Sequence, residues 1–407
     1  MNHETKLTLF IFLIVILMGS AGFIIEREIS GKSILSPFSR SVNIFSLFGI
    51  AEKPKRIIYG YLPYWSIENS EYLQLDKLTH IAYFGLYLNP DGSFMETTLG
   101  EDDNVITEPA KNNWENNDEL SKLIRKASRR DIRFALTVIA HIDEDTDAFL
   151  DCRSCWDTLL NNLRTELDKK DITDVNLNFE YTGFTEEDKQ ERFVELTRFL
   201  NEELDKTYED SFLVVSAFAD SIEEKRVSSK LEKLGKAADA IFIMGYDFHR
   251  PQSDSVGPVA PIEGPGFNIT QMLKEHLSKV PPNKVILGVP YYGYNWIVED
   301  DSEYSNRIDG SDLNGFSQSQ SYEAVLETII EVDPILKWNE EGKAPYFTYV
   351  SPETGSLRTA YYENADSLAI KYDLINQNNL AGVGIWALGY DGGYTELWDL
   401  LYEKFIK

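Results

Sequence analysis

The chain has 407 residues, of which 43% are hydrophobic and 13% aromatic, enough for one large domain or two ordinary ones with a sizeable core. Acidic residues outnumber basic ones by 67 to 39, which gives a formal net charge of −28. This balance lacks the basic footprint of a nucleic-acid-binding protein and would repel polyanions. We therefore expect no nucleic acid as a partner, and a neutral polymer suits the chain better.

The N-terminal segment at residues 7–25 contains no charged residue, and its 19 positions just reach the length that spans a bilayer. The Gly-Ser-Ala sequence at 19–21 could instead be a signal-peptide cleavage site. We expect residues 1–28 to form an uncleaved membrane anchor rather than a signal peptide, followed by a linker at 29–54. In either case the rest of the chain lies outside the cytoplasm, at the cell membrane or secreted.

From residue 55 onward, short β-rich runs alternate with amphipathic helical stretches, as in a parallel sheet with crossover helices. The predicted strands cover residues 57–61, 79–84, 132–139, 175–180, 212–217, 240–244, 285–290 and 382–386. The predicted helices cover residues 116–130, 148–169, 185–204, 228–237, 269–279, 366–377 and 394–405. Eight strands with intervening helices predict an α/β fold, a (β/α)8 TIM barrel over residues 55–407. The segment at about 292–361 is too long for a loop, so we expect a small inserted α+β subdomain with a strand at 346–350.

The fourth predicted strand and the residue before it, 174–180, have the sequence Asp-Val-Asn-Leu-Asn-Phe-Glu. Because side chains alternate along a strand, the apolar residues face the surrounding helices and the polar ones face the barrel axis. The axis-facing residues are Asn176, Asn178 and Glu180. Glu180 lies at the C-terminal end of the strand, where barrel enzymes hold their catalytic groups. The alternative is a layer of buried polar groups that satisfy one another and take no part in catalysis.

Other strand ends carry aromatic and polar residues that suit a sugar-binding cleft. They include Tyr61 in the first strand, the run Met244-Gly-Tyr246-Asp247-Phe-His249 in the sixth, Tyr292 in the seventh and Trp386 in the eighth. His249 is expected to make structural hydrogen bonds. His141, near the end of the third strand, is a weaker candidate for the lining of the cleft.

The fourth-strand run resembles the signature of glycoside hydrolase family 18, the chitinase-like barrels. That signature has an Asp-Gly start, then alternating Asp or Asn and apolar residues, and a final Glu. The runs Met-Gly-Tyr-Asp and Gly-Val-Pro-Tyr-Tyr-Gly, Lys-Trp at 337–338, Pro-Tyr-Phe at 345–347 and Tyr-Glu-Asn-Ala-Asp at 362–366 fit as well. The resemblance covers about residues 56–407, and it is closest in character to the cell-wall and spore-cortex lytic N-acetylglucosaminidases of the family.

The resemblance implies a retaining mechanism without an enzymic nucleophile. The substrate's own N-acetyl carbonyl attacks the anomeric carbon, and Glu180 protonates the leaving oxygen. Asn178, Tyr246 and Asp247 are implied to hold the acetamido group. The residues expected to contact the sugar are Trp386 as an apolar floor, Met244, Tyr61, Tyr292 and Asn176.

Two positions depart from the family pattern. Thr173-Asp174 replaces the opening Asp-Gly, and Asn178 replaces the usual Asp, so it can accept an N–H bond but brings no negative charge. Two functions therefore stay open: a hydrolase of β-1,4-linked N-acetylglucosamine polymers, either chitin or peptidoglycan, and a glycan-binding protein with little catalysis. A third is another glycosidase family that shares only the barrel, with Asp247 or Asp391 as a second catalytic carboxylate.

The only two cysteines are Cys152 and Cys155, in the sequence Asp-Cys-Arg-Ser-Cys. They are too few for a thiolate metal site, and the sequence implies no metal or organic cofactor. A local disulfide in an exported protein and a pair of free thiols both remain open.

Overall fold

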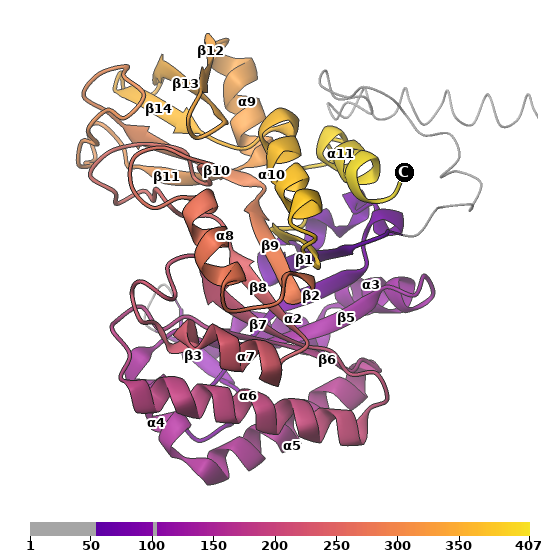
Figure 1. Ribbon diagram of the computed structural model, residues 1–407. Coiled ribbons are helices and arrows are strands. Elements are labelled where there is room, and N and C mark those ends of the chain that lie inside the picture. The colour runs from indigo at the N-terminus through magenta and orange to yellow at the C-terminus, as the bar shows by residue number, and fades with distance from the viewer. Residues whose placement is uncertain (1–53, 101–103) are drawn as a thin grey trace, which may run out of the picture.

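The computed structural model describes residues 54–100 and 104–407 (Figure 1). The predicted membrane anchor and almost all of the predicted linker lie outside these residues. Among the helices that are described, none is long and apolar enough to cross a bilayer.

Eight parallel strands close into a barrel in the order β1-β15-β9-β8-β7-β6-β5-β2. Their bounds are β1 Ile57–Pro63, β2 His80–Tyr87, β5 Arg133–Ala140, β6 Asp174–Phe179, β7 Leu213–Phe218, β8 Ala240–Met244, β9 Val285–Pro290 and β15 Gly382–Trp386. Every predicted strand coincides with one of them, and the predicted (β/α)8 barrel is confirmed.

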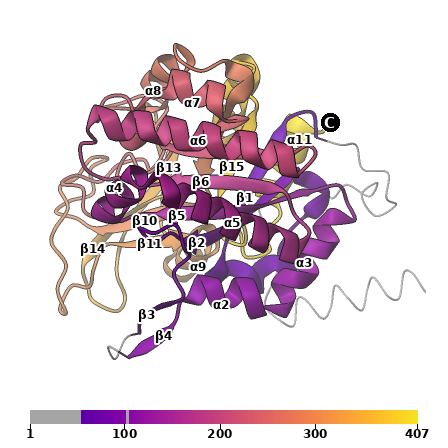
Figure 2. The ribbon, with the colours of Figure 1, turned by 90° about the horizontal axis from the view of Figure 1, so that it is seen from below.

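Helices surround the barrel (Figures 1 and 2). They are α2 Pro109–Asn116, α3 Asp118–Ser128, α4 Asp143–Asp151, α5 Arg153–Lys170, α6 Glu187–Thr207, α7 Leu231–Ala237, α8 Ile269–Leu277, α10 Ala365–Gln377 and α11 Glu396–Phe405. The single helix predicted at 148–169 is wrong, because the chain breaks at Cys152 with φ −93° and ψ 87°. The amide of Cys152 ends α4 on the carbonyl of Phe149, at 3.1 Å, and its own carbonyl accepts from Cys155 in the first turn of α5, at 2.9 Å.

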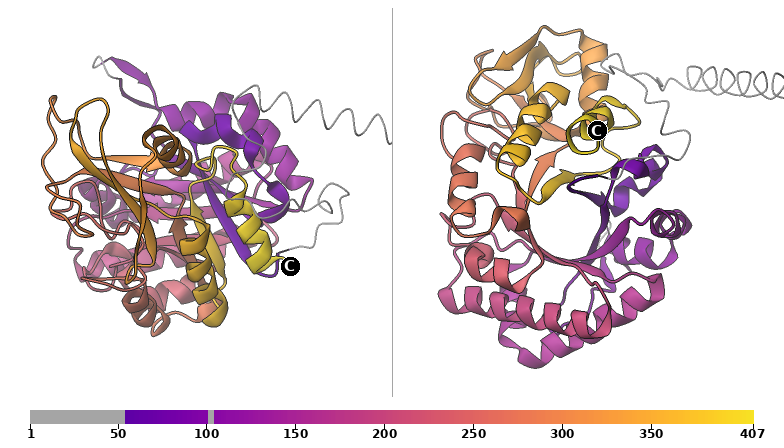
Figure 3. Two further views of the ribbon diagram at one scale, coloured as in Figure 1. Left: turned by 90° about the horizontal axis from the view of Figure 1, so that it is seen from above. Right: turned by 45° about the vertical axis from the view of Figure 1, so that its right-hand side comes forward.

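The segment between β9 and α10 forms a five-stranded antiparallel sheet in the order β11-β10-β14-β13-β12, beyond the C-terminal end of β9 (Figures 1 and 3). Its elements are β10 Tyr292–Ile297, β11 Gln318–Ser321, α9 Tyr322–Val332, β12 Leu336–Asn339, β13 Ala344–Val350 and β14 Leu357–Tyr361. The strand predicted at 346–350 falls within β13. Because β10 continues directly from β9, its residues come close to the C-terminal mouth of the barrel.

A short hairpin, β3 Thr97–Leu99 and β4 Val105–Thr107, projects from the segment after β2 (Figures 2 and 3). The sequence did not predict it. Each strand has only three residues and none of them is buried, so no buried apolar face marks the hairpin.

The alternation predicted along β6 is confirmed. Val175, Leu177 and Phe179 belong to the apolar layer between the strands and the helices. Phe179 packs against Phe193 of α6, with ring centroids 4.8 Å apart, and burial of each such side chain contributes about 1.5–3 kcal/mol. This packing fixes the strand so that its alternate residues point toward the barrel axis.

Candidate active site

A cavity of about 330 Å³ opens at the C-terminal ends of the barrel strands. It is lined by Tyr61, Trp65, Phe84, Tyr87, His141, Asn178, Glu180, Ser216, Phe218, Met244, Tyr246, Asp247, Arg250, Tyr292, Tyr294, Ser319, Trp386 and Tyr390. All the residues predicted to catalyse or to contact the sugar are among them, except Asn176. The structure therefore brings together side chains from seven of the barrel strands, or the residues just after them, and from β10 and β11.

Asn176 lies below the cavity and is completely buried. Its amide nitrogen is 3.1 Å from the hydroxyl of Ser216 and 3.3 Å from the carbonyl of Val214. Ser216 in turn bonds to the hydroxyl of Tyr61 at 2.8 Å. The expectation that Asn176 contacts the sugar is therefore wrong, because its side-chain amide is hydrogen-bonded to residues beneath the floor of the cavity.

Glu180 follows β6 directly, and its carboxyl group forms a compact cluster with Asn178 and His141. The side-chain amide of Asn178 donates to Oε1 of Glu180 at 2.8 Å. Nε2 of His141 lies 3.1 Å from the same amide nitrogen and 3.4 Å from that Oε1. The strand register explains the meeting, because Ala140 accepts from the amide of Glu180 at 2.9 Å and so brings His141 alongside.

The environment of Glu180 sets its protonation. Burial favours the neutral acid, but the contacts with His141 and the hydrogen bond from Asn178 outweigh it, and Arg250 adds a more distant positive charge. The pKa of Glu180 is therefore lowered from its ordinary value. In the free protein this carboxyl group is an anion at neutral pH, so proton donation by Glu180 is favoured under acidic conditions.

Asp247, three residues after β8, also lines the cavity and is anchored by two tyrosines of β10. Its Oδ1 accepts a bond of 2.6 Å from the hydroxyl of Tyr294 and a shorter one from Tyr292. The backbone of Asp247 has φ +64°, an uncommon left-handed conformation for a residue other than glycine. Burial, and after it the charge of Asp247, raises the pKa of both tyrosines, so their hydroxyls stay protonated and serve as donors.

Aromatic rings form the floor of the cavity. Trp386, at the end of β15, lies 4.6 Å from Phe84 in an edge-on arrangement and 5.5 Å from Tyr61, measured between ring centroids. Such packing holds a large flat ring in place while one face stays available to a ligand. Met244 and Tyr246, at the end of β8, complete this side of the cavity.

Several lining residues lay outside the prediction. Tyr294 and Ser319 come from the inserted sheet, and Arg250 comes from the loop after β8. Site residues were predicted from the few positions that follow each barrel strand. These positions include Tyr292 but not Tyr294, which lies two residues further along β10. His141 was predicted only as a weaker candidate, although it contacts both Asn178 and Glu180.

Two other predicted residues lie away from the cavity. Asp391 is buried and accepts from the indole nitrogen of Trp398 at 2.8 Å; burial raises its pKa to about 6. It cannot reach the cavity as a second catalytic carboxylate. His249 bonds through Nδ1 to the carbonyl of Pro258 at 2.8 Å, which fits the expected structural role. Within the described residues, no group of three or more His, Cys, Asp and Glu side chains could hold a metal ion.

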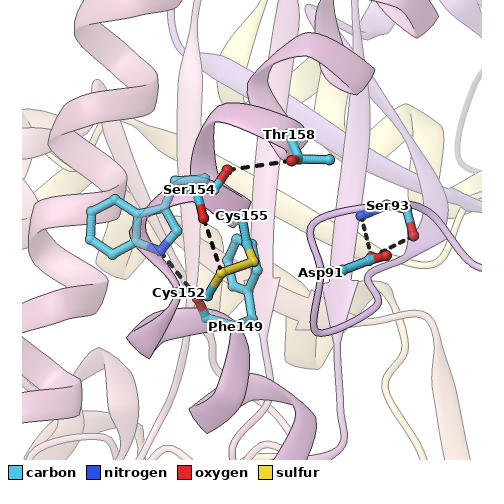
Figure 4. The surroundings of a disulfide bond; sticks show 8 residues. Asp91, Ser93, Phe149, Cys152, Ser154, Cys155 and Thr158 are labelled. Atoms are coloured by element: carbon cyan, nitrogen blue, oxygen red, sulfur yellow. Dashed lines mark hydrogen bonds between the residues drawn. A yellow bond between two sulfur atoms is a disulfide. The ribbon is translucent and has the colours of Figure 1, made fainter.

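Cys152 and Cys155 form a disulfide at the junction of α4 and α5 (Figure 4), with their Cα atoms 5.2 Å apart. The turn that carries Gly92 packs against this junction, and a Cβ atom at Gly92 would lie 2.1 Å from the carbonyl oxygen of Cys155. The disulfide therefore stands at a tightly packed helix junction, and neither cysteine lines the cavity.

A barrel with Glu180 at the end of its fourth strand, and with Asp247 and aromatic rings in the same cavity, fits the sugar-cleaving cleft of a glycoside hydrolase. The sequence matches the model of glycosyl hydrolases family 18 over residues 57–391. The chain therefore belongs to glycosyl hydrolase family 18.

Named relatives and solved structures agree with this assignment. The chain is 20% identical over 337 residues to the cortical fragment-lytic enzyme of Bacillus anthracis, covering 81% of this chain and 68% of the relative. It is 26% identical over 192 residues to di-N-acetylchitobiase of Homo sapiens, covering 43% of this chain and 49% of the relative. The aligned segments cover between 33% and 68% of the lengths of the first curated relatives.

The fold is shared with the spore cortex-lytic enzyme SleL of Bacillus megaterium, with a TM-score of 0.67 and 20% identity over 88% of this chain and 75% of that one. It is also shared with the Group IV chitinase of Ostrinia furnacalis in complex with allosamidin, with a TM-score of 0.72 and 18% identity over 86% of this chain and 98% of that one. At these identities the likeness establishes the barrel fold.

Proposed function

We propose that this chain hydrolyses β-1,4-linked polymers that contain N-acetylglucosamine, chitin or peptidoglycan, with Glu180 as the general acid. The observation that carries the proposal is the cavity itself. Two carboxyl groups, Glu180 and the tyrosine-anchored Asp247, line one cavity with aromatic rings at the mouth of a family 18 barrel. The names of the relatives, a cortical fragment-lytic enzyme and a di-N-acetylchitobiase, favour the same class of substrate.

In the proposed first step the carbonyl oxygen of the substrate's acetamido group attacks the anomeric carbon, and the bond to the leaving sugar breaks. Glu180 gives its proton to the leaving oxygen. Asp247 holds the acetamido nitrogen, and Tyr246 and Tyr292 close around the group, while Trp386 stacks under the sugar ring. Water then opens the cyclic intermediate and returns a proton to Glu180, so the configuration at the anomeric carbon is retained.

A second candidate function is glycan binding with little cleavage. The observation that favours it is Asn178, which replaces the family's usual Asp and donates a hydrogen bond to Glu180. That bond stabilises the carboxylate and lowers the pKa of Glu180, which opposes proton donation. The hydrolase is preferred because the cavity keeps the carboxyl group of Glu180 at the end of β6, which glycan binding alone would not require.

The deciding experiment incubates the protein with N-acetylglucosamine oligomers and with purified peptidoglycan, between about pH 4 and 8, and reads products by mass spectrometry. We expect shorter fragments with new reducing ends, formed fastest on the acidic side. The Glu180→Gln variant, assayed in parallel, should bind the same glycans without releasing fragments. Binding by both proteins with no fragment at any pH would replace the hydrolase with the glycan-binding function.

We further propose that residues 55–407 form the catalytic domain and work outside the cytoplasm, at the membrane or secreted. The uncharged segment at 7–25 and the Cys152–Cys155 disulfide support this location, since disulfides persist in oxidising compartments. Protease treatment of intact cells tests it. Degradation of the chain, with a cytoplasmic marker spared, supports export, and complete protection contradicts it.

A further inference from the structure

A second cavity, of about 350 Å³, lies beside the catalytic cavity and shares Tyr87 and His141 with it. This side pocket is built by the segments that follow β1, β2 and β5, at the same end of the barrel. Its lining residues are Tyr64, Tyr87, Leu88, Met95, Thr98, Glu108, Pro109, Ile139, Ala140, His141, Ile142, Asp145, Thr146 and Phe149. The side pocket and the catalytic cavity therefore adjoin each other at these two residues.

Two carboxyl groups, Glu108 and Asp145, stand in this otherwise mostly apolar lining. Glu108 is only 4% exposed. Among the described lining residues there is no Lys or Arg. The nearest lysine in sequence, Lys111, directs its ammonium group to Glu96, Glu115 and Glu166 instead, at 3.3–3.5 Å.

The structural role of Glu108, capping α2, uses only one of its two carboxylate oxygens. Its Oε2 accepts from the backbone amide of Lys111 at 2.7 Å and so caps the first turn of α2. A cap needs one acceptor, which a neutral Ser, Asn or Gln side chain would also provide. Within the described part of the chain the other oxygen has no hydrogen-bond partner, and a buried carboxylate without a counter-charge is costly. The pocket thus offers a carboxylate oxygen for which the described residues supply no hydrogen-bond donor, in a lining whose one basic side chain is that of His141.

We infer that the side pocket binds a primary ammonium group carried by the glycan, which deepens the proposed hydrolase function by naming a feature of its substrate. Glu108 and Asp145 would accept charge-assisted hydrogen bonds from the ammonium group, and the rings of Tyr64, Tyr87 and Phe149 would face its alkyl or sugar stem. A fully acetylated chitin carries no such group. The amine could be the free 2-amino group of a glucosamine unit or the side-chain amine of a diamino acid in a peptidoglycan stem peptide.

The test measures binding by calorimetry in the full-length Glu180→Gln protein, so that cleavage does not enter the result. One arm compares an N-acetylglucosamine tetramer with tetramers in which a single unit is de-N-acetylated. The other compares a disaccharide-peptide that has a free side-chain amine with the same molecule after acetylation of that amine. Each arm is repeated with Glu108→Gln, which keeps the helix cap, and with Asp145→Asn. The matched control is Glu144→Gln, one residue earlier on α4 and outside the pocket, with the same change of charge.

We expect the amine-bearing ligand of at least one arm to bind about tenfold more tightly than its acetylated partner, and this ratio to fall toward one in Glu108→Gln. Asp145→Asn should reduce the ratio and Glu144→Gln should keep it. A preference in the first arm alone identifies the sugar amine, and one in the second alone the peptide amine. Equal affinities in both arms, or a ratio that Glu108→Gln and Asp145→Asn leave unaltered, overturn the inference. Because cleavage is absent throughout, a failed hydrolase assay does not affect this result.

Discussion

Acidic residues lie at both ends of strand β6, and they differ in their hydrogen-bond partners and in their exposure. Asp174, at the start, has a side chain that is 2% exposed and is held by the guanidinium of Arg133, with Nε to Oδ2 at 2.6 Å. Glu180, just past the end, has a side chain that is 28% exposed and is held by the neutral amide of Asn178. Burial raises the pKa of Asp174, against the opposing effect of Arg133, and the pair is enclosed, whereas Glu180 keeps access to the cavity and can exchange a proton with a ligand.

This contrast separates a structural carboxylate from a reactive one on a single strand. Both residues stand in the run that resembles the family signature, so sequence position alone does not distinguish them. What distinguishes them is the hydrogen-bond partner of each carboxyl group and its access to a ligand. Substitutions at the two ends should therefore affect different measurements, activity at one end and stability at the other.

The largest effect is expected for Glu180→Gln. The change keeps the size of the side chain and removes the transferable proton, so kcat should fall about 10²–10⁴-fold, with a melting temperature close to that of the original protein. Steady-state rates on N-acetylglucosamine oligomers and differential scanning calorimetry measure the two quantities. Glu144→Gln, exposed on α4, serves as the control and should leave both values in place. Hydrolysis by Glu180→Gln at the original rate would show that another group is the acid.

Arg133→Ala should act on the opposite end and cost about 2 kcal/mol of unfolding free energy. That is less than the ~3–5 kcal/mol of a fully buried pair, because the Arg133 side chain is 35% exposed. Urea denaturation gives the free energy, and kcat per folded molecule should stay within about twofold. The control is Lys236→Ala, which breaks the exposed pair with Glu232 and should leave the unfolding free energy almost unaltered. A loss of kcat without a loss of stability would mean that Asp174 and Arg133 support the active site directly.

The parts of the structure that the sequence predicted are those that local periodicity determines. Alternation placed Asn178 and Glu180 on the inner face of β6. The residues just after β8 and β9 gave Asp247 and Tyr292, and the last residue of β15 gave Trp386. The contact between His141 and Glu180 depends on how β5 and β6 align, which no single segment encodes.

Three further features escaped prediction for the same kind of reason. The break at Cys152 is set by capping bonds across a helix junction, and the β3–β4 hairpin has strands too short for a periodic signal. The side pocket is formed by loops from three separate strands. Each of these depends on contacts between distant segments, whereas the sequence patterns describe one segment at a time.

A further substitution tests whether an aromatic residue at the mouth of the barrel contributes to glycan affinity rather than to stability. Trp386→Ala should weaken glycan affinity about tenfold, because the exposed face of the ring stacks on sugar. The matched control is Trp398→Ala, whose indole is completely buried and bonded to Asp391; it should cost about 3–5 kcal/mol of stability. Calorimetric titration and thermal melts compare the two. A large fall in melting temperature with unaltered affinity in Trp386→Ala would make that residue part of the core.

The smallest and most specific effect is expected for Asn178→Asp, which changes the partner of Glu180 from a donor to an anion. The hydrogen bond of 2.8 Å from the side-chain amide of Asn178 stabilises the carboxylate and contributes to the lowered pKa of Glu180. An Asp at this place removes that bond and adds a like charge, so the pKa of Glu180 should rise and the two groups should titrate as a coupled pair. Since the general acid acts in its protonated form, activity falls as the pH rises through this pKa. The alkaline limb of the profile should therefore move upward by about one unit.

The added charge should also raise the maximal rate, because it stabilises the positive charge that develops on the cyclising acetamido group. The measurement is kcat/KM for both forms from about pH 4 to 8, which reports the ionisations of the free enzyme. Asn178→Ala is the matched control: it removes the amide donor without adding a charge, so it should move the limb in the same direction but leave the maximal rate no higher. If Asn178→Asp is slower at every pH, the neutral amide is suited to this protein's own substrate. In that case the amide of Asn178, which keeps Glu180 ionised in the free protein, would give up its hydrogen bond to Glu180 when substrate binds. Catalysis would then depend on the pKa of Glu180 in the complex.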